Sequence, residues 1–353
     1  MQSLRQSSVP PLIRSDGSWA LSPEEKSELL SEHFAGKSEL LPPQVNEFTE
    51  VLNSLGQSMS GFLPIRARKV SSVLRGLRED SGTGPDDIAA RVLKFCAASL
   101  TIPVAIICRS IVRSGSWPRL WKTHWVFPLF KKKSRSDPAN YRGIHLTAQV
   151  SKVAERVVGE SLKLFLEGTE AYGPNQFAYS SGRGTRDALA LCVLRWLVYM
   201  DEGVKIGTYC SDVSGAFDRV SAERLLQKLA SKGVHPQILA VIRDWLADRI
   251  AHVIVDGTSS TARALVNSVY QGTVWGPRLW NCLFEDARRP INDEGYSEVV
   301  FADDLNCYKS FDSACSNLAI LDDLAECQAS LHRWGKANQV RFDAGKESLR
   351  TLH

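Results

Sequence analysis

The sequence lacks zinc-binding cysteine patterns, a secretory signal and long apolar runs, and each absence argues against a class of protein. None of the eight cysteines forms a C-x-x-C pair or has a histidine at zinc-finger spacing, which argues against a zinc module. The first ten residues are polar, so no secretory signal is expected. We also expect no apolar run of about 18 residues, the length that spans a bilayer. These absences predict reduced thiols and an intracellular protein, in the nucleus or cytoplasm and not in a membrane.

Acidic residues are scarce in one stretch of the chain. Between Arg109 and Arg156 there are eleven lysines and arginines but only two acids, Asp137 and Glu155. This segment therefore carries +9, whereas the whole chain carries a formal net charge of +4. A basic block on an otherwise acidic remainder predicts a polyanionic partner. The alternative is a basic surface that only contacts solvent.

The pattern of apolar residues predicts a mixed α/β (α+β) protein. A hydrophobic content of 44% over 353 residues is enough for a large buried core. Helical spacing and capping residues predict helices over 22–34, 64–79, 86–95, 151–166, 221–232 and 314–334. Short apolar runs bounded by turn residues predict strands over 125–130, 204–213, 252–255 and 299–302.

Carboxylates stand at the ends of two of these predicted strands. Asp303 and Asp304 follow the strand at 299–302, and Asp212 lies at the carboxyl end of the strand at 204–213. Burying unpaired carboxylates is costly unless a cation compensates, and Mg²⁺ prefers carboxylate oxygens. Solvated turn residues are the alternative for the pair considered alone. Strand-end acids from two strands of one sheet would suit a two-metal phosphoryl-transfer site.

The motifs around these acids resemble those of the reverse transcriptases of non-LTR retrotransposons. Three segments resemble palm motifs: SDVSGAFD at 211–218, QGTVWGP at 271–277 and FADD at 301–304. Three others resemble the fingers motifs and the motif after the aspartates: YRGIHL at 141–146, the segment 176–185 and the segment 338–346. The resemblance covers about residues 66–350 and implies a right-hand polymerase palm, built on an antiparallel sheet, with fingers. Gly143 and His145 replace the usual Pro and Ser, which we expect to loosen the fingers turn.

The resemblance implies a set of metal ligands. Asp212 and Asp303 would bind two Mg²⁺ ions, with Mn²⁺ as a substitute. Asp304 would assist, and the carbonyl of Val213 would complete one coordination shell. Lys346 would protonate the pyrophosphate, although a plain surface lysine is an equal alternative.

The resemblance also implies a nucleotide site. Phe217 would stack under the deoxyribose and exclude a 2′-hydroxyl, with a core aromatic as the alternative. Gln271 would contact the incoming dNTP, and Gly272 would let the backbone approach it closely. Lys131 and Arg142 would hold the triphosphate, since arginine grips phosphate oxygens bidentately. An RNA template and a DNA primer would be the other partners.

Three regions are expected along the chain. Residues 1–65 resemble the linker between endonuclease and polymerase, 66–200 the fingers and 201–353 the palm. The chain stops soon after Lys346, so a helical thumb is expected to be missing, and no endonuclease is expected ahead of the linker. The predicted function is RNA-directed DNA synthesis by two-metal nucleotidyl transfer. The alternatives are a catalytically silent relic that binds nucleic acid and, less consistent with Phe217, an RNA-dependent RNA polymerase.

Overall fold

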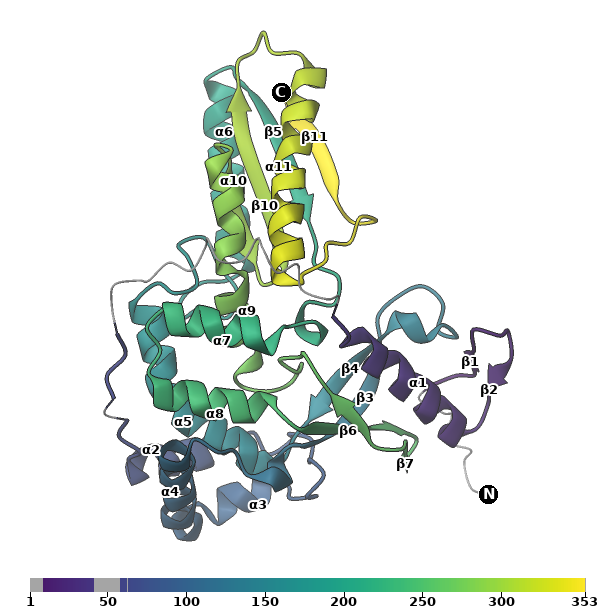
Figure 1. The fold of residues 1–353 in the computed structure, drawn as a ribbon, viewed down its shortest axis with the longest axis vertical. Coiled ribbons are helices and arrows are strands. Elements are labelled where there is room, and N and C mark those ends of the chain that lie inside the picture. The colour runs from purple at the N-terminus through teal and green to yellow at the C-terminus, as the bar shows by residue number, and fades with distance from the viewer. Residues whose placement is uncertain (1–8, 41–57, 62, 353) are drawn as a thin grey trace. The chain divides into compact units, whose positions relative to one another are not determined.

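The computed structural model describes residues 9–40, 58–61 and 63–352, and the chain divides into two compact units (Figure 1). Unit 1 comprises Met1–Glu39, Met59–Leu162 and Val234–Gly276. Unit 2 comprises Leu40–Ser58, Lys163–Gly233 and Pro277–His353. Each unit has its own sheet and its own buried core. The lead-in, fingers and palm regions expected from the sequence have different bounds from these units, and that division stays a prediction.

Unit 1 is built on a mixed sheet of five strands in the order β4-β3-β6-β7, with β8 also paired to β6. The strands are β3 (Thr123–Phe130), β4 (Tyr141–Leu146), β6 (Arg249–Val255), β7 (Thr258–Ser259) and β8 (Arg263–Leu265). β3 runs parallel to β6, and every other pair is antiparallel. The tight turn expected at Asp256-Gly257 joins β6 to β7, and both of its residues have positive φ angles, 50° and 85°.

The helices of unit 1 are α1 (Pro23–Lys37), α2 (Ala67–Arg75), α3 (Ala90–Phe95), α4 (Ala97–Ser114), α8 (Pro236–Leu246) and the first part of α5 (Gln149–Gly168). Of these, α1 packs on the sheet, and α2, α3, α4 and α8 pack against one another. A short hairpin of β1 (Leu12–Ile13) and β2 (Trp19–Ala20) precedes α1. Ser22 caps α1 as expected, in a capping box with Glu25. Because α1 packs on β6, β7 and β8, residues 9–39 belong structurally to unit 1.

The helix α4 was not expected from the sequence. By length and composition it could cross a membrane, with a mean hydropathy of 1.4, although Arg109 and Arg113 interrupt its apolar run. Because the two arginines interrupt α4, it is not the continuous apolar run that was expected to be absent, and the absence of a membrane span stays a prediction. One such helix is weak evidence for a membrane span, because core helices of soluble proteins pass the same test.

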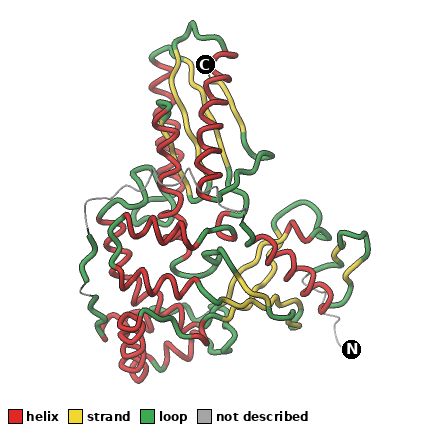
Figure 2. Tube along the Cα trace, in the orientation of Figure 1, coloured by secondary structure: helices red, strands yellow, loops and turns green. Residues whose placement is uncertain are grey.

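Unit 2 is built on an antiparallel sheet of four strands in the order β11-β5-β10-β9. The strands are β5 (Lys205–Ser211), β9 (Ser297–Phe301), β10 (Asp304–Phe311) and β11 (Ser348–Leu352). Figure 2 shows these strands in yellow, with long helices alongside them. The antiparallel sheet expected to carry the three aspartates is therefore present within the described part of the chain.

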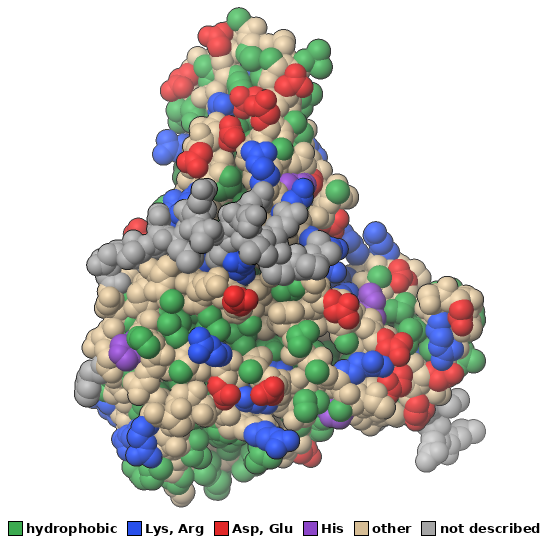
Figure 3. Space-filling view, in the orientation of Figure 1, with side chains coloured by type: hydrophobic (Ala, Val, Ile, Leu, Met, Phe, Trp, Pro, Cys, Tyr) green, Lys and Arg blue, Asp and Glu red, His purple; other side chains and the backbone are tan. Residues whose placement is uncertain are grey.

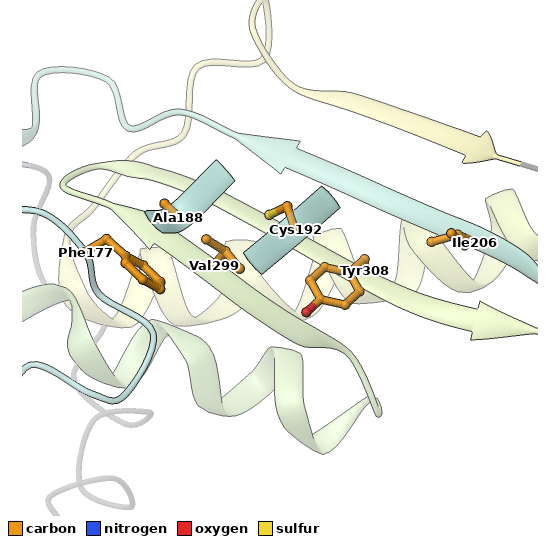
Figure 4. Packing of buried hydrophobic residues seen from close by; sticks show 6 residues of the cluster. All are labelled: Phe177, Ala188, Cys192, Ile206, Val299 and Tyr308. Atoms are coloured by element: carbon orange, nitrogen blue, oxygen red, sulfur yellow. The ribbon is translucent and has the colours of Figure 1, made fainter. Parts of the chain in front are cut away.

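Both faces of the central strand β5 are covered by helices. Ile206 faces α6 (Thr185–Asp201), where Ala188 and Cys192 pack against Val299 and Tyr308 (Figure 4). The next residue, Gly207, faces α11 (Asn317–Asn338): a Cβ there would lie 3.0 Å from Ile320 and 2.8 Å from Phe311. Because side chains alternate along a strand, this arrangement buries β5 almost continuously.

The remaining elements of unit 2 are α7 (Ala222–Ser231), α10 (Arg288–Asp293) and most of α9 (Gly276–Phe284). Two buried ion pairs join α7 and its end to the turn after α9. Lys228 Nζ lies 2.6 Å from Asp286, and Lys232 Nζ lies 2.7 Å from Glu285. On the face of the molecule in Figure 3, basic and acidic side chains are interspersed.

Most elements expected from periodicity are present, with shifted ends. The helix expected over 64–79 is shorter, Ala67–Arg75, and the helix expected to start at Asp86 or Asp87 begins at Ala90. The helices expected over 151–166, 221–232 and 314–334 correspond to α5, α7 and α11. The elements that were not predicted include α4, α6, α8, β4 and β11. The break expected at Pro42-Pro43 lies outside the described residues.

Candidate functional site

The acids of unit 2 meet at one end of the sheet, where β5 ends and β10 begins. The β5–β10 register pairs Ser211 with Leu305, so the next residues along, Asp212 and Asp304, lie opposite each other. Directly opposed residues in an antiparallel pair share one face of the sheet, with Cβ atoms about 5 Å apart. The carboxylates of Asp212 and Asp304, which come from separate strands, therefore lie next to each other.

This crowding changes the electrostatics of the site. Partial burial and then the neighbouring charge of Asp212 raise the pKa of Asp304. The ammonium of Lys346 forms an ion pair with the carboxylate of Asp212 and lies 3.5 Å from Asp343 Oδ2. The hydrogen bond to Asp212 raises the pKa of Lys346. The structure thus brings together three predicted site residues: Asp212, Asp304 and Lys346.

Asp303 lies in the two-residue turn between β9 and β10. The preceding residue, Ala302, has a φ of 61°, a conformation that residues other than glycine seldom adopt. Two side chains hold this backbone. Gln176 accepts from the amide of Ala302 at 3.0 Å and donates to its carbonyl at 3.3 Å, and Trp280 Nε1 donates to the same carbonyl at 3.1 Å. Gln176 and Trp280 therefore position the turn that carries Asp303.

Phe217 follows Asp212 on a short 3₁₀ turn, Ala216–Asp218. Its side chain is buried and takes part in an aromatic cluster. The ring lies 6.3 Å from that of Tyr179, nearly perpendicular to it, and 6.0 Å from that of Trp280 in a stacked arrangement. Val213 is also buried and forms an antiparallel bridge with Phe342, so the backbone after Asp212 is paired with that segment.

In unit 1, the loop at Gln271-Gly272 is attached to β4. The amide of His145 donates to the carbonyl of Gln271 at 2.8 Å. Gly272 has a φ of 101°, and a Cβ there would lie 2.6 Å from the carbonyl oxygen of His145. Only glycine tolerates both conditions. The side-chain oxygen of Gln271 is buried without a hydrogen-bond partner among the described residues.

The two departures from the usual fingers motif do not loosen β4, contrary to our expectation. A Cβ on Gly143 would lie 2.8 Å from Val126 and 3.4 Å from Phe34, so glycine lets α1 pack closely on the strand. His145 is buried, and its Nδ1 lies 3.0 Å from Nδ1 of His124. Both residues lie within the regular β3–β4 pairing.

A buried arginine supports this histidine pair. Arg249 is fully buried and donates to Nε2 of His124 at 2.7 Å and to two backbone carbonyls. Burial and then the charge of Arg249 lower the pKa of His145 to about 3, and the same two causes hold the pKa of His124 well below its usual value. Both imidazoles are neutral in the folded protein.

Glu155, whose role was not predicted from the sequence, binds the loop after Gly272. Its buried carboxylate accepts from the amides of Val274 and Trp275 at 2.6 and 3.3 Å, and from Trp245 Nε1 at 3.4 Å. Burial raises the pKa of Glu155. The sequence did contain a signal for this role: Glu155 is an acid on the apolar face of the helix predicted over 151–166, and one of only two acids between Arg109 and Arg156. Gln176 was noted only as part of a motif.

The predicted phosphate contacts lie on the β3–β4 hairpin of unit 1. Lys131, Lys132 and Lys133 are exposed in the loop that follows β3. Arg142 is exposed on β4, paired with Leu129 of β3. The loop is ordered by Asn140, whose carbonyl accepts from the amide of Lys131 at 2.9 Å.

The donor atoms at the end of the unit 2 sheet suit a hard cation. Carboxylate and carbonyl oxygens are the ligands that Mg²⁺ prefers, and Asp212, Asp304 and the Val213 backbone supply them. Among the described residues, no group of three or more His, Cys, Asp or Glu side chains is already arranged around a metal position. The eight cysteines are all unpaired thiols.

Comparison with known proteins defines the class to which this fold and site belong. The family described as "Reverse transcriptase (RNA-dependent DNA polymerase)" matches residues 130–350, so the chain belongs to the reverse transcriptase family. Members of this family generally use divalent metals.

The relatives come from non-LTR retrotransposons, which confirms the resemblance drawn from the motifs. The chain is 26% identical, over 94% of its length, to the RNA-directed DNA polymerase from mobile element jockey of Drosophila melanogaster. It is 25% identical, over 96% of its length, to the probable RNA-directed DNA polymerase from transposon X-element of the same species. A Pol polyprotein from the type-1 element R1 of Bradysia coprophila is 27% identical over 79% of the chain. These matches span 37%, 38% and 27% of the respective relatives.

Proposed function

We propose that this chain is the polymerase portion of a retrotransposon reverse transcriptase and adds deoxynucleotides to a primer on an RNA template. The observation that carries the proposal is the opposition of Asp212 and Asp304 across β5 and β10, beside Lys346. In a chain of the reverse transcriptase family, acids placed at adjacent strand ends are suited to hold the cations of nucleotidyl transfer.

Asp212, Asp303, Asp304 and the Val213 carbonyl would hold two Mg²⁺ ions, or Mn²⁺ in their place. Bound cations supply charge stabilisation to the attacking and leaving oxygens of the transfer. Gln176 and Trp280 keep the turn of Asp303 in place, so the carboxylates need little reorganisation when substrate binds. Lys346 would donate a proton to the departing pyrophosphate.

Each unit contains residues with a proposed nucleotide contact: Lys131, Arg142 and Gln271 in unit 1, and Phe217 in unit 2. Lys131 and Arg142 would hold the triphosphate, and both are exposed on their hairpin. Gln271 would contact the incoming dNTP from a loop whose shape depends on Gly272 and His145. Phe217 would lie against the sugar and exclude a 2′-hydroxyl, a steric form of substrate selection.

Primer extension on an RNA template tests the proposal. The unaltered chain should extend a DNA primer with dNTPs only when Mg²⁺ or Mn²⁺ is present. Extension should be much weaker with rNTPs. A chain that binds the template–primer but never extends it would favour the alternative, a silent relic that binds nucleic acid. Preferential use of rNTPs would favour an RNA polymerase.

A further inference from the structure

We propose that Lys346 is a built-in counter-ion for Asp212, which divalent cations must displace in order to bind. The inference rests on the proposed function, because it takes Asp212 as a metal ligand. Lys346 would thus have a second role besides proton donation: its ammonium would pair with Asp212 until a metal ion and nucleotide bind.

The contacts of Lys346 support this role. Its ammonium lies on Oδ2 of Asp212, one of the oxygens that a cation would need. The same ammonium lies 3.5 Å from Asp343 Oδ2. Because Asp304 is next to Asp212, the ammonium also offsets the repulsion between the two carboxylates. One lysine therefore performs part of the charge compensation that a metal would provide.

The backbone that carries Lys346 is held close to Asp212. The amide of Lys346 donates to the carbonyl of Asp343 at 2.8 Å, and the amide of Asp343 donates to the carbonyl of Asp212 at 2.9 Å. These two bonds connect the lysine to the end of β5. The backbone of Lys346 is therefore held near Asp212, and the entropy lost when the pair forms is mainly that of the lysine side chain.

A buried carboxylate next to Lys346 anchors this segment further. Glu347 accepts from Tyr209 of β5 and lies 3.0 Å from Gln328 Nε2 and 2.8 Å from His332 Nε2 of α11. Its side chain is only 5% exposed. Glu347 is therefore a positioning residue: it holds Lys346 next to Asp212 and Asp304.

The competition has a predictable sign. A cation that binds Asp212 must first break the ion pair with Lys346, so its apparent affinity is reduced by the stability of that pair. Removing the ammonium leaves two uncompensated carboxylates, which attract a divalent cation more strongly. Loss of Lys346 should thus tighten metal binding even though it removes a residue of the proposed catalytic machinery.

The test is a direct titration of the 353-residue chain with Mn²⁺, with free Mn²⁺ followed by electron paramagnetic resonance and no nucleotide present. Lys346→Met should bind Mn²⁺ about tenfold more tightly than the unaltered chain, a difference of about 1.4 kcal/mol. Lys346→Arg keeps the charge and should bind as the unaltered chain does. Lys336→Met removes the same charge from an exposed position on α11 and should change the affinity less than twofold. Glu347→Gln should give an intermediate affinity.

The outcomes separate this inference from the proposed function. If Asp212→Asn weakens Mn²⁺ binding but Lys346→Met leaves it unchanged or weaker, the counter-ion role is overturned and the metal site stands. If Asp212→Asn leaves Mn²⁺ binding unchanged, both fail. Melting curves show which variants are folded, and Lys346→Gln replaces Lys346→Met if the latter unfolds.

Discussion

Nδ1 of His124 lies 3.0 Å from Nδ1 of His145, and the buried guanidinium of Arg249 determines which of the two donates. A guanidinium has donors only, so Nε2 of His124 must accept and Nδ1 of His124 must carry the proton. Nδ1 of His145 then accepts, and its proton resides on Nε2. A single charge in the core therefore fixes the tautomers of both histidines beside the Gln271 loop.

Acid should destabilise the chain through this pair. The pKa of His145 falls to about 3 on folding, and that of His124 is also far below the usual value of 6.5, so the unfolded chain binds more protons between these limits. Stability is therefore full above about pH 6.5 and falls by up to about 1.4 kcal/mol per pH unit for each histidine below it. Urea unfolding between pH 7.5 and 5 measures this slope.

The matched variants are His145→Gln and His252→Gln. Losing one of the buried imidazoles should flatten the slope; His252 lies half-buried on the same sheet, and His252→Gln is the matched histidine replacement. If His145→Gln does not alter the slope of unfolding free energy against pH, the two histidines are not a buried neutral pair.

Gln176 should be required for the turn of Asp303. Gln176→Leu leaves the Ala302 amide unsatisfied and deprives its carbonyl of one of two donors, so it should cost about 1–3 kcal/mol of stability and most of the primer extension. Gln176→Glu keeps an acceptor for the amide but places a buried carboxylate oxygen against the Ala302 carbonyl, so it should also lose stability. Urea unfolding and primer-extension rates are measured for both variants. If both variants match the unaltered chain, Gln176 does not hold the turn of Asp303.

Phe217→Ala should admit ribonucleotides while deoxynucleotide use is partly retained. The same truncation removes a buried ring from the cluster with Tyr179 and Trp280 and should cost about 3–5 kcal/mol. Incorporation of rNTP and dNTP is compared on one RNA template beside a melting curve. Early melting with an unchanged sugar preference would make Phe217 a core residue only.

The lysines after β3 should contribute to the salt dependence of nucleic-acid binding. Each of Lys131, Lys132 and Lys133 that contacts a phosphate should lower the log–log slope by about 0.7 to 0.9 when replaced by Gln. Fluorescence anisotropy with labelled template–primer over a salt series measures it. Lys336→Gln, in the other unit, is the control. An unchanged slope in the triple variant would assign these lysines to a solvated loop.

Local features of the structure were predictable from the sequence. The Ser22 cap, the Asp256-Gly257 turn and the position of Asp212 after β5 depend on nearby residues, and each has a short sequence signature. Element ends were less predictable: α3 begins three or four residues after the expected start.

The supporting residues of the site could not be predicted in the same way. Gln176 contacts Ala302, 126 residues away, and Glu155 contacts Val274, 119 residues away. Glutamine and glutamate have no periodicity that distinguishes these roles from surface positions. The helix α6 was missed because apolar residues occur all round it: Ala188 and Cys192 are buried, while Leu189 and Leu194 are exposed.

A nuclear or cytoplasmic location of the protein stays a prediction.

The role of the strand-end acids is tested by Mg²⁺-dependent incorporation of a single dNTP on an RNA template by Asp212→Asn, Asp303→Asn and Asp322→Asn. Asp322 is exposed on α11 and serves as the matched control. We expect Asp212→Asn and Asp303→Asn to reduce incorporation at least a hundredfold, or about 2.7 kcal/mol in activation free energy, without lowering the melting temperature. Asp322→Asn should behave as the unaltered chain. Near-normal incorporation by folded Asp212→Asn or Asp303→Asn would contradict the assignment of these acids as the catalytic centre.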